Sequence, residues 1–199
     1  MPNCLFCDDE EAKVTLEHTL SDSIRSLLPP GPFTVDIFGV RPGLPTSHTQ
    51  FETDTASFLR RAYCEKCNGG WMQQLDQDTA PLIQEMVEDH SVTLSPTEQT
   101  AIATWATKMA LVYESLSGRD KAIPDAKYKW FYENRRPFPS EPVQLAHYMD
   151  PERHQYVRRP ITRRDYVTGD VLGVENVLVT LTIGAYIAFT VLPVNGVFL

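Results

Sequence analysis

The chain lacks the motifs by which several large enzyme classes are recognised. Its 199 residues contain no P-loop, no GxGxxG turn, no Ser-His-Asp arrangement and no internal repeat. Nucleotide-binding and serine-hydrolase chemistry of the familiar kinds is therefore not indicated. Hydrophobic residues make up 42% of the chain and charged residues 22%, which is typical of a soluble globular protein with one core or two small ones.

The chain also has little positive charge, and what it has is unevenly distributed. The formal net charge is −8, with −9 in residues 1–95 and +1 in residues 96–199. Proteins that bind nucleic acid tightly and without sequence preference normally carry a basic patch. The acidic half instead favours a role in gathering divalent ions or in meeting a protein partner through an acidic surface.

No basic segment followed by an apolar run stands at the N-terminus, so we expect no secretory signal and a cytoplasmic location. The longest apolar run, 177–194, lies near the C-terminus. Its threonines, its β-branched residues and Gly184 favour a hairpin of two buried strands over a membrane-spanning helix. A membrane-attached protein is the less favoured alternative, and we expect no membrane partner.

Only four cysteines are present, and they form two C-x₂-C doublets, Cys4 with Cys7 and Cys64 with Cys67. Two such doublets supply the four sulfur ligands of a tetrahedral Zn²⁺ site. The pattern predicts one structural zinc that ties a long excursion of the chain back to its N-terminus. Reduced thiols paired by chance, or disulfides, are the alternatives.

The residues around the doublets carry a resemblance to a known family. Glu17 and His18 lie between the doublets, and Asn68 directly follows the second one in a segment, 68–71, that reads Asn-Gly-Gly-Trp. This arrangement, over residues 4 to 80, resembles the zinc-containing form of the HNH endonucleases, which are frequent in phages and bacteria.

The resemblance implies a zinc-bound ββα-metal unit and a hydrolase that cleaves phosphodiester bonds. Of the two nucleic acids, we favour DNA over RNA as the partner. By the same resemblance, His18 is the general base that activates water, and Glu17 and Asn68 are ligands of a catalytic Mg²⁺ or Mn²⁺. The residue types suit this chemistry, because histidine titrates near neutral pH and hard cations prefer oxygen ligands.

The chain departs from the family at one position. The family's middle Asn is missing, since no Asn occurs between Asn3 and Asn68. Asp54, as a possible metal ligand, and His48 are the candidates to replace it. The other interpretation is a catalytically inactive zinc-knuckle protein that acts as a protein- or nucleic-acid-binding module.

A nuclease needs cations that contact the phosphates, and the chain offers two groups of them. These candidate nucleic-acid-binding residues are Arg60, Arg61, Arg158, Arg159, Arg163 and Arg164. Aromatic side chains are the other candidates, since Trp71 and the run 128–132 are able to stack on bases. For Trp71 and for this aromatic run, we expect packing in the core instead.

The periodicity of apolar residues predicts the remaining elements. Strands are expected at 13–16, 56–63, 143–148 and 155–157, and as a hairpin over 177–194. Helices are expected from Ser21 or Asp22, over about 68–89 with a kink or break before Pro81, from a capping box at Ser95 to Gly118, and over 124–134. Residues 29–55 read as a loop insertion with one weak strand or hairpin.

These expectations combine into an α+β fold. A zinc-bound ββα-metal region occupies residues 1–90, including the insertion at 29–55. A lobe over residues 91–199, made of a helical layer and a C-terminal antiparallel sheet, packs against it.

Overall fold

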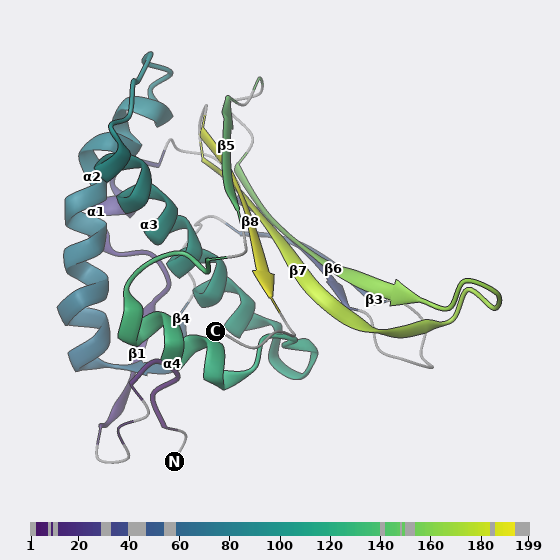
Figure 1. Cartoon of the computed structure of the whole chain (residues 1–199). Helices are drawn as coiled ribbons and strands as arrows, with labels where there is room; N and C mark the ends of the chain where they lie inside the picture. Colours follow the sequence, from purple (N-terminus) through teal and green to yellow (C-terminus); the bar gives the residue numbers. More distant parts are fainter. Residues whose placement is uncertain are drawn as a thin grey trace.

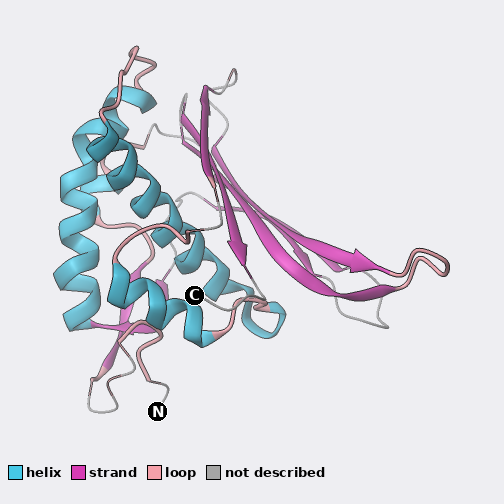
Figure 2. Cartoon of the chain, in the orientation of Figure 1, coloured by secondary structure: helices cyan, strands magenta, loops and turns pink. Residues whose placement is uncertain are grey.

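A computed structural model of the chain describes most of its residues, namely 3–7, 9, 12–28, 33–39, 47–53, 59–139, 142–147, 149, 154–183 and 186–193. The architecture is α+β, as predicted: helices pack together on one side of a long, strongly twisted sheet (Figures 1 and 2). One arm of that sheet, formed by two strands, extends away from the helices.

The N-terminal part consists of two paired strands followed by a helix. Strand β1 (Val14–His18) pairs antiparallel with β4 (Leu59–Cys64), so that Val14 lies opposite Cys64 and His18 opposite Leu59. The chain leaves β4 through a wide π-helical turn, η1 (Cys67–Met72), and continues as α2 (Gln73–Val87). A short helix, α1 (Asp22–Arg25), packs against α2. The end of β1 and the beginning of the helix therefore come from segments about fifty residues apart in the chain.

Helix α3 (Pro96–Glu114) is the centre of the molecule. It packs against α2 on one side and against the large sheet on the other, and every residue from Thr104 to Glu114 is buried. A helix buried on all sides is expected to be apolar all round. Here two charged residues interrupt the pattern, Lys108 and Glu114, and both form ion pairs.

The predicted capping box begins α3. The Ser95 hydroxyl accepts a hydrogen bond from the backbone N–H of Glu98, and the Glu98 carboxylate accepts one from the N–H of Ser95 at 2.8 Å. After α3 come a 3₁₀ segment, η2 (Ser115–Asp120), and helix α4 (Asp125–Asn134). Helix α4 matches the helix predicted at 124–134, whereas α3 ends four residues earlier than expected and the 3₁₀ segment contains Gly118.

The large sheet has the order β3-β2-β6-β7-β8-β5. Its strands are β2 (Phe33–Gly39), β3 (Ser47–Thr53), β5 (Val143–His147), β6 (His154–Arg164), β7 (Val171–Ile183) and β8 (Tyr186–Pro193). The hairpin predicted over 177–194 is present as β7 and β8, and β6 and β7 form the long arm of Figure 1. Within the described residues, no helix is both long and apolar enough to cross a membrane.

Two sequence-based predictions about the sheet were incomplete. The insertion contains a β2–β3 hairpin, and β2 pairs in parallel with β6, so the sheet is mixed and not purely antiparallel. Phe33 and Val35 of β2 are buried to 1% exposure, which explains why this hairpin joins the sheet instead of covering the N-terminal unit. The sheet thus draws strands from both sides of the boundary predicted at residue 90.

The predicted break in α2 is also absent, because the helix continues through Pro81. Proline removes the helical donor for the carbonyl four residues earlier, which is that of Gln77. Both Pro81 and Gln77 are exposed, so the cost of the missing hydrogen bond is small on this face of the helix. The helix ends in a Schellman motif, with Asp89 in the left-handed region at φ 62° and the N–H of His90 bonded to the carbonyl of Glu85 at 2.8 Å.

Candidate metal centre and the cavity beside it

The four cysteines come together although the doublets are about sixty residues apart. Their sulfur atoms all lie within 4.8 Å of one another, and Cys4, Cys64 and Cys67 are buried. The Sγ atoms of Cys7 and Cys64 are 3.7 Å apart, far beyond a disulfide bond. Four sulfurs at about 2.3 Å from a tetrahedral Zn²⁺ are about 3.8 Å from each other, so the cluster has the size of a zinc site.

Hydrogen bonds and proton sharing also suit a thiolate site. The backbone N–H of Cys64 donates to the Cys4 sulfur at 3.4 Å. A hydrogen bond from Cys67 lowers the pKa of Cys4 to about 4, and the same interaction raises the pKa of Cys67. One thiolate is thus stabilised even without a cation, and a bound metal ion would stabilise the others.

The indole of Trp71 gives a further test of the fit. Its Nε1 atom is buried and has no hydrogen-bond partner among the described residues. A metal-bound thiolate at Cys67 would be an acceptor for this N–H. The guanidinium of Arg135 lies 4.0 Å from the ring centroid of Trp71, which places a cation next to the cluster. Donor set, spacing and surroundings therefore fit zinc, as the sequence predicted.

Phe6, inside the first doublet, anchors that doublet in the core. Its ring is fully buried, stacks on Tyr63 with centroids 5.4 Å apart and meets the edge of Trp71 at 5.2 Å. It also contacts Tyr128 and Phe131 of α4. Tyr128 and Phe131 are core residues, as expected, and Trp71 is partly buried and packs against the core. The two x positions of the doublet could have suggested the anchor, since they are Leu and Phe.

A polar cavity of about 360 Å³ lies beside the cysteine cluster. His18, at the end of β1, and Asn68, directly after Cys67, both line it. The wall formed by α2 presents Gln73, Asp76 and Gln77, which share one face of the helix at i, i+3 and i+4. Two of the three predicted catalytic residues therefore border one cavity. The third, Glu17, lies in β1 next to His18 and opposite Arg60, and its side chain is not among those described.

Asp76 was not recognised from the sequence, although a signal for it existed. It lies on the buried stripe of α2, which otherwise consists of uncharged residues, namely Thr79, Ile83 and Val87. A carboxylate on such a stripe needs a partner. Asp76 Oδ1 accepts hydrogen bonds from Trp105 Nε1 at 2.8 Å and from Lys108 Nζ.

The residues proposed to replace the missing middle Asn do not border this cavity as far as the structure describes them. His48 lies on β3, stacks on Phe38 with ring centroids 4.3 Å apart and bonds to Asp36 at 2.9 Å. The described contacts of His48 are therefore within the large sheet. Asp54 lies outside the described residues.

Arg158 requires a correction, because it cannot contact phosphates as predicted. Its side chain is 1% exposed, and its guanidinium donates to both carboxylate oxygens of Glu114, at 2.7 and 3.0 Å, and to the carbonyl of Phe38 at 2.6 Å. The physical reason is that β6 alternates its side chains between two faces, and Arg158 falls on the face that packs against α3.

The other candidate arginines occupy two strands. Arg61 is exposed on β4, and Arg159 is exposed on β6, where it lies 4.9 Å from the ring of Phe38. Arg60 belongs to β4, and the pair Arg163 and Arg164 ends β6; the side chains of these three are not described. Among the described residues that line the cavity of His18, none is an arginine.

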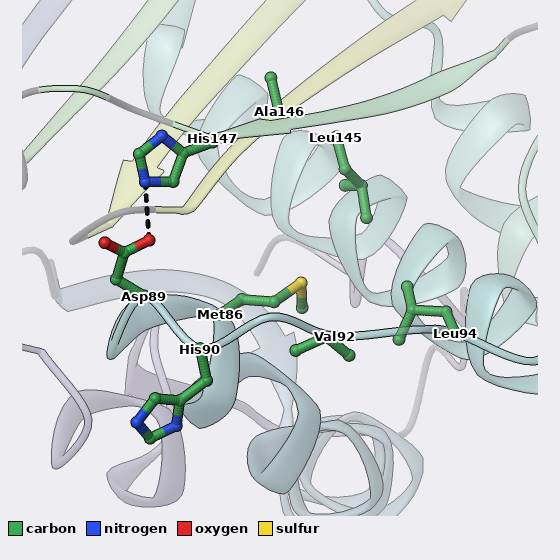
Figure 3. Close-up of a pocket in the computed structure, with 8 residues that line it drawn as sticks. All are labelled: Met86, Asp89, His90, Val92, Leu94, Leu145, Ala146 and His147. Atoms are coloured by element: carbon green, nitrogen blue, oxygen red, sulfur yellow. Dashed lines mark hydrogen bonds and ion pairs between the residues drawn. The ribbon is translucent and has the colours of Figure 1, made fainter.

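A second cavity, of about 280 Å³, lies at the other end of α2, between the helix terminus and the edge strand β5 (Figure 3). Its floor is apolar, formed by Met86, Val92, Leu94 and Leu145. The carboxylate of Asp89 points to the ring of His147, at 2.7 Å from Nε2, and so connects α2 to β5. None of the predicted catalytic, zinc-binding or nucleic-acid-binding residues lines this second cavity.

Comparisons with known proteins do not extend this description. No protein-family model matches the chain, and neither a curated protein nor a solved structure matches it. A proposed function for this protein therefore rests on its sequence and on the geometry of the site described above.

Proposed function

We propose that the protein is a metal-dependent endonuclease of the HNH type that hydrolyses phosphodiester bonds, with DNA as its expected substrate. The observation that carries this proposal is the cavity that His18 and Asn68 share beside four clustered cysteines. The arrangement of the elements adds support, because β4 pairs with β1 and continues through η1 into α2, as a ββα-metal unit requires.

Each residue has a chemical role in this proposal. The cysteines hold a structural Zn²⁺, which fixes the start of the chain against β4. His18 is exposed and, as the proposed general base, takes a proton from the attacking water. Glu17 and Asn68 are the proposed ligands of Mg²⁺ or Mn²⁺, which when bound stabilises negative charge on the phosphate.

The oxygen and amide groups around the cavity fit a hard cation. Residues with carboxylate, amide or hydroxyl groups line it, namely Asp22, Asp76, Asn68, Gln73, Gln77, Ser21 and Ser23. Hard divalent ions prefer such ligands and keep part of their water shell. The cysteine cluster supplies the soft ligands that zinc prefers, so the two ions would separate by ligand type.

Phosphate contacts are assigned to the exposed Arg61 and to Arg60, on the strand that pairs with β1, and to Arg159, Arg163 and Arg164 on the arm. Each such contact adds about 0.9 to the slope of log affinity against log salt on duplex DNA. Replacing Arg61 by Gln should therefore lower the slope by about this amount. An unchanged slope would remove Arg61 from the interface.

Incubation of the zinc-loaded protein with supercoiled plasmid and Mg²⁺ or Mn²⁺ tests the proposal. We expect nicked and linear products, and His18→Ala should slow their formation by about 10²-fold or more. His90→Ala is the matched control, because His90 is also exposed but lies at the opposite end of α2, bonded to Glu85. Wild-type protein that leaves the plasmid intact, or equal cleavage by His18→Ala, would contradict the proposal.

A second candidate function, a binding module for a protein partner, rests on the arm formed by β6 and β7. This arm exposes large apolar side chains at and near its end, namely Ile161, Tyr166, Val167 and Leu172. Exposed apolar groups gathered in this way mark protein interaction sites. A purified protein without cleavage activity whose self-association in sedimentation is removed by Tyr166→Ser and Val167→Ser would favour this candidate.

A further inference from the structure

Asp76 is the charged residue most closely built into the cavity of His18. It is 3% exposed, and it lines the cavity together with His18 and Asn68. Its position on the buried stripe of α2 holds it in the wall of the cavity, between the helix and α3. The carboxylate is therefore held by the core while it borders the space in which the proposed reaction occurs.

The two oxygens of this carboxylate have different surroundings. Oδ1 accepts two hydrogen bonds, one from Trp105 and one from Lys108. The side chains of these two donors, on α3, are themselves buried. Among the described residues, no hydrogen bond is formed to Oδ2, and Asp76 belongs to the lining of the cavity. A carboxylate paired with an ammonium group only accepts hydrogen bonds, so Oδ2 offers the cavity an acceptor in a fixed position.

A purely structural role explains this arrangement poorly. An ion pair as buried as Asp76 with Lys108 loses much of its hydration, and apolar residues of similar volume would often join two helices equally well. The next positions of the same stripe, Thr79, Ile83 and Val87, are uncharged. The one charged residue of the stripe, Asp76, is thus the one that borders the cavity.

We propose that Oδ2 of Asp76 accepts hydrogen bonds from water molecules bound to a divalent cation in this cavity. Lys108 and Trp105 are then positioning residues that orient the carboxylate. The inference rests on the proposed function, since the cation is the one assigned to Glu17 and Asn68. Mg²⁺ and Mn²⁺ keep several waters in protein sites, and groups that bond to the ligands of an ion commonly change its affinity by about 10–100-fold.

Mn²⁺ binding to the zinc-loaded protein, followed by the paramagnetic resonance of free Mn²⁺, tests the inference without requiring activity. Asp76→Asn should weaken Mn²⁺ binding by about 10-fold or more. Asp78→Asn is the matched control, because it removes the same charge from the same helix. Asp78 is exposed, bonds to Gln74 at 2.8 Å and does not line the cavity.

A double variant separates ion binding from stability. Asp76→Asn alone leaves the ammonium group of Lys108 buried without its carboxylate, which lowers Tm. Asp76→Asn with Lys108→Met removes both charges and should regain most of the lost Tm, whereas Mn²⁺ affinity should stay low. Recovery of Mn²⁺ affinity in the double variant, or an Asp76→Asn affinity equal to that of Asp78→Asn, would overturn the inference.

The same measurements distinguish this inference from the nuclease proposal. Mn²⁺ binding that depends on Asp76, in a protein that does not cleave DNA, would uphold the inference and reject the nuclease. Cleavage by wild type combined with equal Mn²⁺ affinities of the Asp76 and Asp78 variants would uphold the nuclease and reject the inference. Wild-type protein that binds no Mn²⁺ would reject both.

Discussion

Two different kinds of interaction hold distant segments of this chain together. In the N-terminal unit, four sulfur atoms gather within 4.8 Å, and they join residues near the start of the chain to β4 and η1. In the sheet, the buried pair of Arg158 and Glu114 joins β6 to α3, and a third bond from Arg158 reaches the carbonyl of Phe38 in β2. The first attachment has the donor set of a metal site made of reduced thiols, whereas the second consists of charge and hydrogen bonding.

This difference predicts that the two regions respond to different treatments. Chelators, oxidants and acid, which protonates thiolates, should act on the cysteine cluster. Removing a carboxylate or a guanidinium should act on the sheet. The variants below separate these two dependences, in order of expected effect.

Replacement of Cys67 by Ser should have the largest effect. Zinc content, expected at about one ion per chain, should fall, and the N-terminal unit should lose stability together with its metal, because metal binding and folding are coupled in such sites. Metal analysis and thermal unfolding are the measurements. A loss of several kcal/mol corresponds to a fall in Tm of about 10 °C or more for a chain of this size.

Removal of bound zinc by a chelator should reproduce this result in the wild-type protein. In both cases the far-UV spectrum of the sheet should change less than the packing around Phe6, followed by near-UV circular dichroism. Purified protein free of zinc that unfolds at the same temperature as zinc-loaded protein would show that the cluster is not a metal site.

Replacement of Glu114 by Gln should destabilise the protein without changing its zinc content. It leaves Arg158 buried and without a charged partner, a change that typically costs about 3–5 kcal/mol, or about 6–20 °C in Tm. The double variant Glu114→Gln with Arg158→Met should recover part of this loss. Zinc loss in Glu114→Gln would show that the cysteine cluster and the Arg158–Glu114 pair are coupled and not independent.

Replacement of Phe6 by Leu tests the aromatic contact between the two parts of the N-terminal unit. We expect a loss of about 1–2 kcal/mol, because volume and ring contacts with Tyr63 and Trp71 are reduced while an apolar side chain remains. Leu5→Ala, at the neighbouring and partly exposed position, is the control. A larger effect of Leu5→Ala would show that the first doublet is anchored differently.

Replacement of Ser95 by Ala should have the smallest effect, about 1 kcal/mol and a few degrees in Tm. Bonds from the hydroxyl and the N–H of Ser95 lower the pKa of Glu98. The contribution of this carboxylate to stability is complete above the ordinary glutamate pKa, about 4.3, and is lost as pH falls through the lowered value. The difference between wild type and Ser95→Ala should therefore shrink in acid.

Local patterns predicted much of this structure. The doublets predicted the cysteine cluster, the capping box predicted the start of α3, and the β-branched run near the C-terminus predicted a hairpin, because each depends on residues that are close in sequence or chemically distinctive. Pairing of β2 with β6 could not be predicted, since it joins segments about 120 residues apart by backbone bonds that carry no residue code.

Which charged side chains are buried is the second feature that could not be predicted from the sequence. Arg158 and Arg159 are adjacent and chemically alike, yet one is buried in an ion pair and the other is exposed. Strand alternation predicts that they differ, but it does not tell which faces the core without knowledge of what packs there. Asp76 presents the same difficulty, because its partners Trp105 and Lys108 are on another helix.

The parallel pairing of β2 with β6 also sets an order for folding during synthesis. The β2–β3 hairpin is synthesised well before its partner strand β6, which follows about 120 residues later in the chain. Until then, Phe33 and Val35 of β2 have no β6 beside them, and such late, long-range contacts slow folding and expose the nascent chain to aggregation. A ribosome stalled near residue 140 should therefore hold a chain whose cysteines are all present and whose β2 does not yet have β6 beside it.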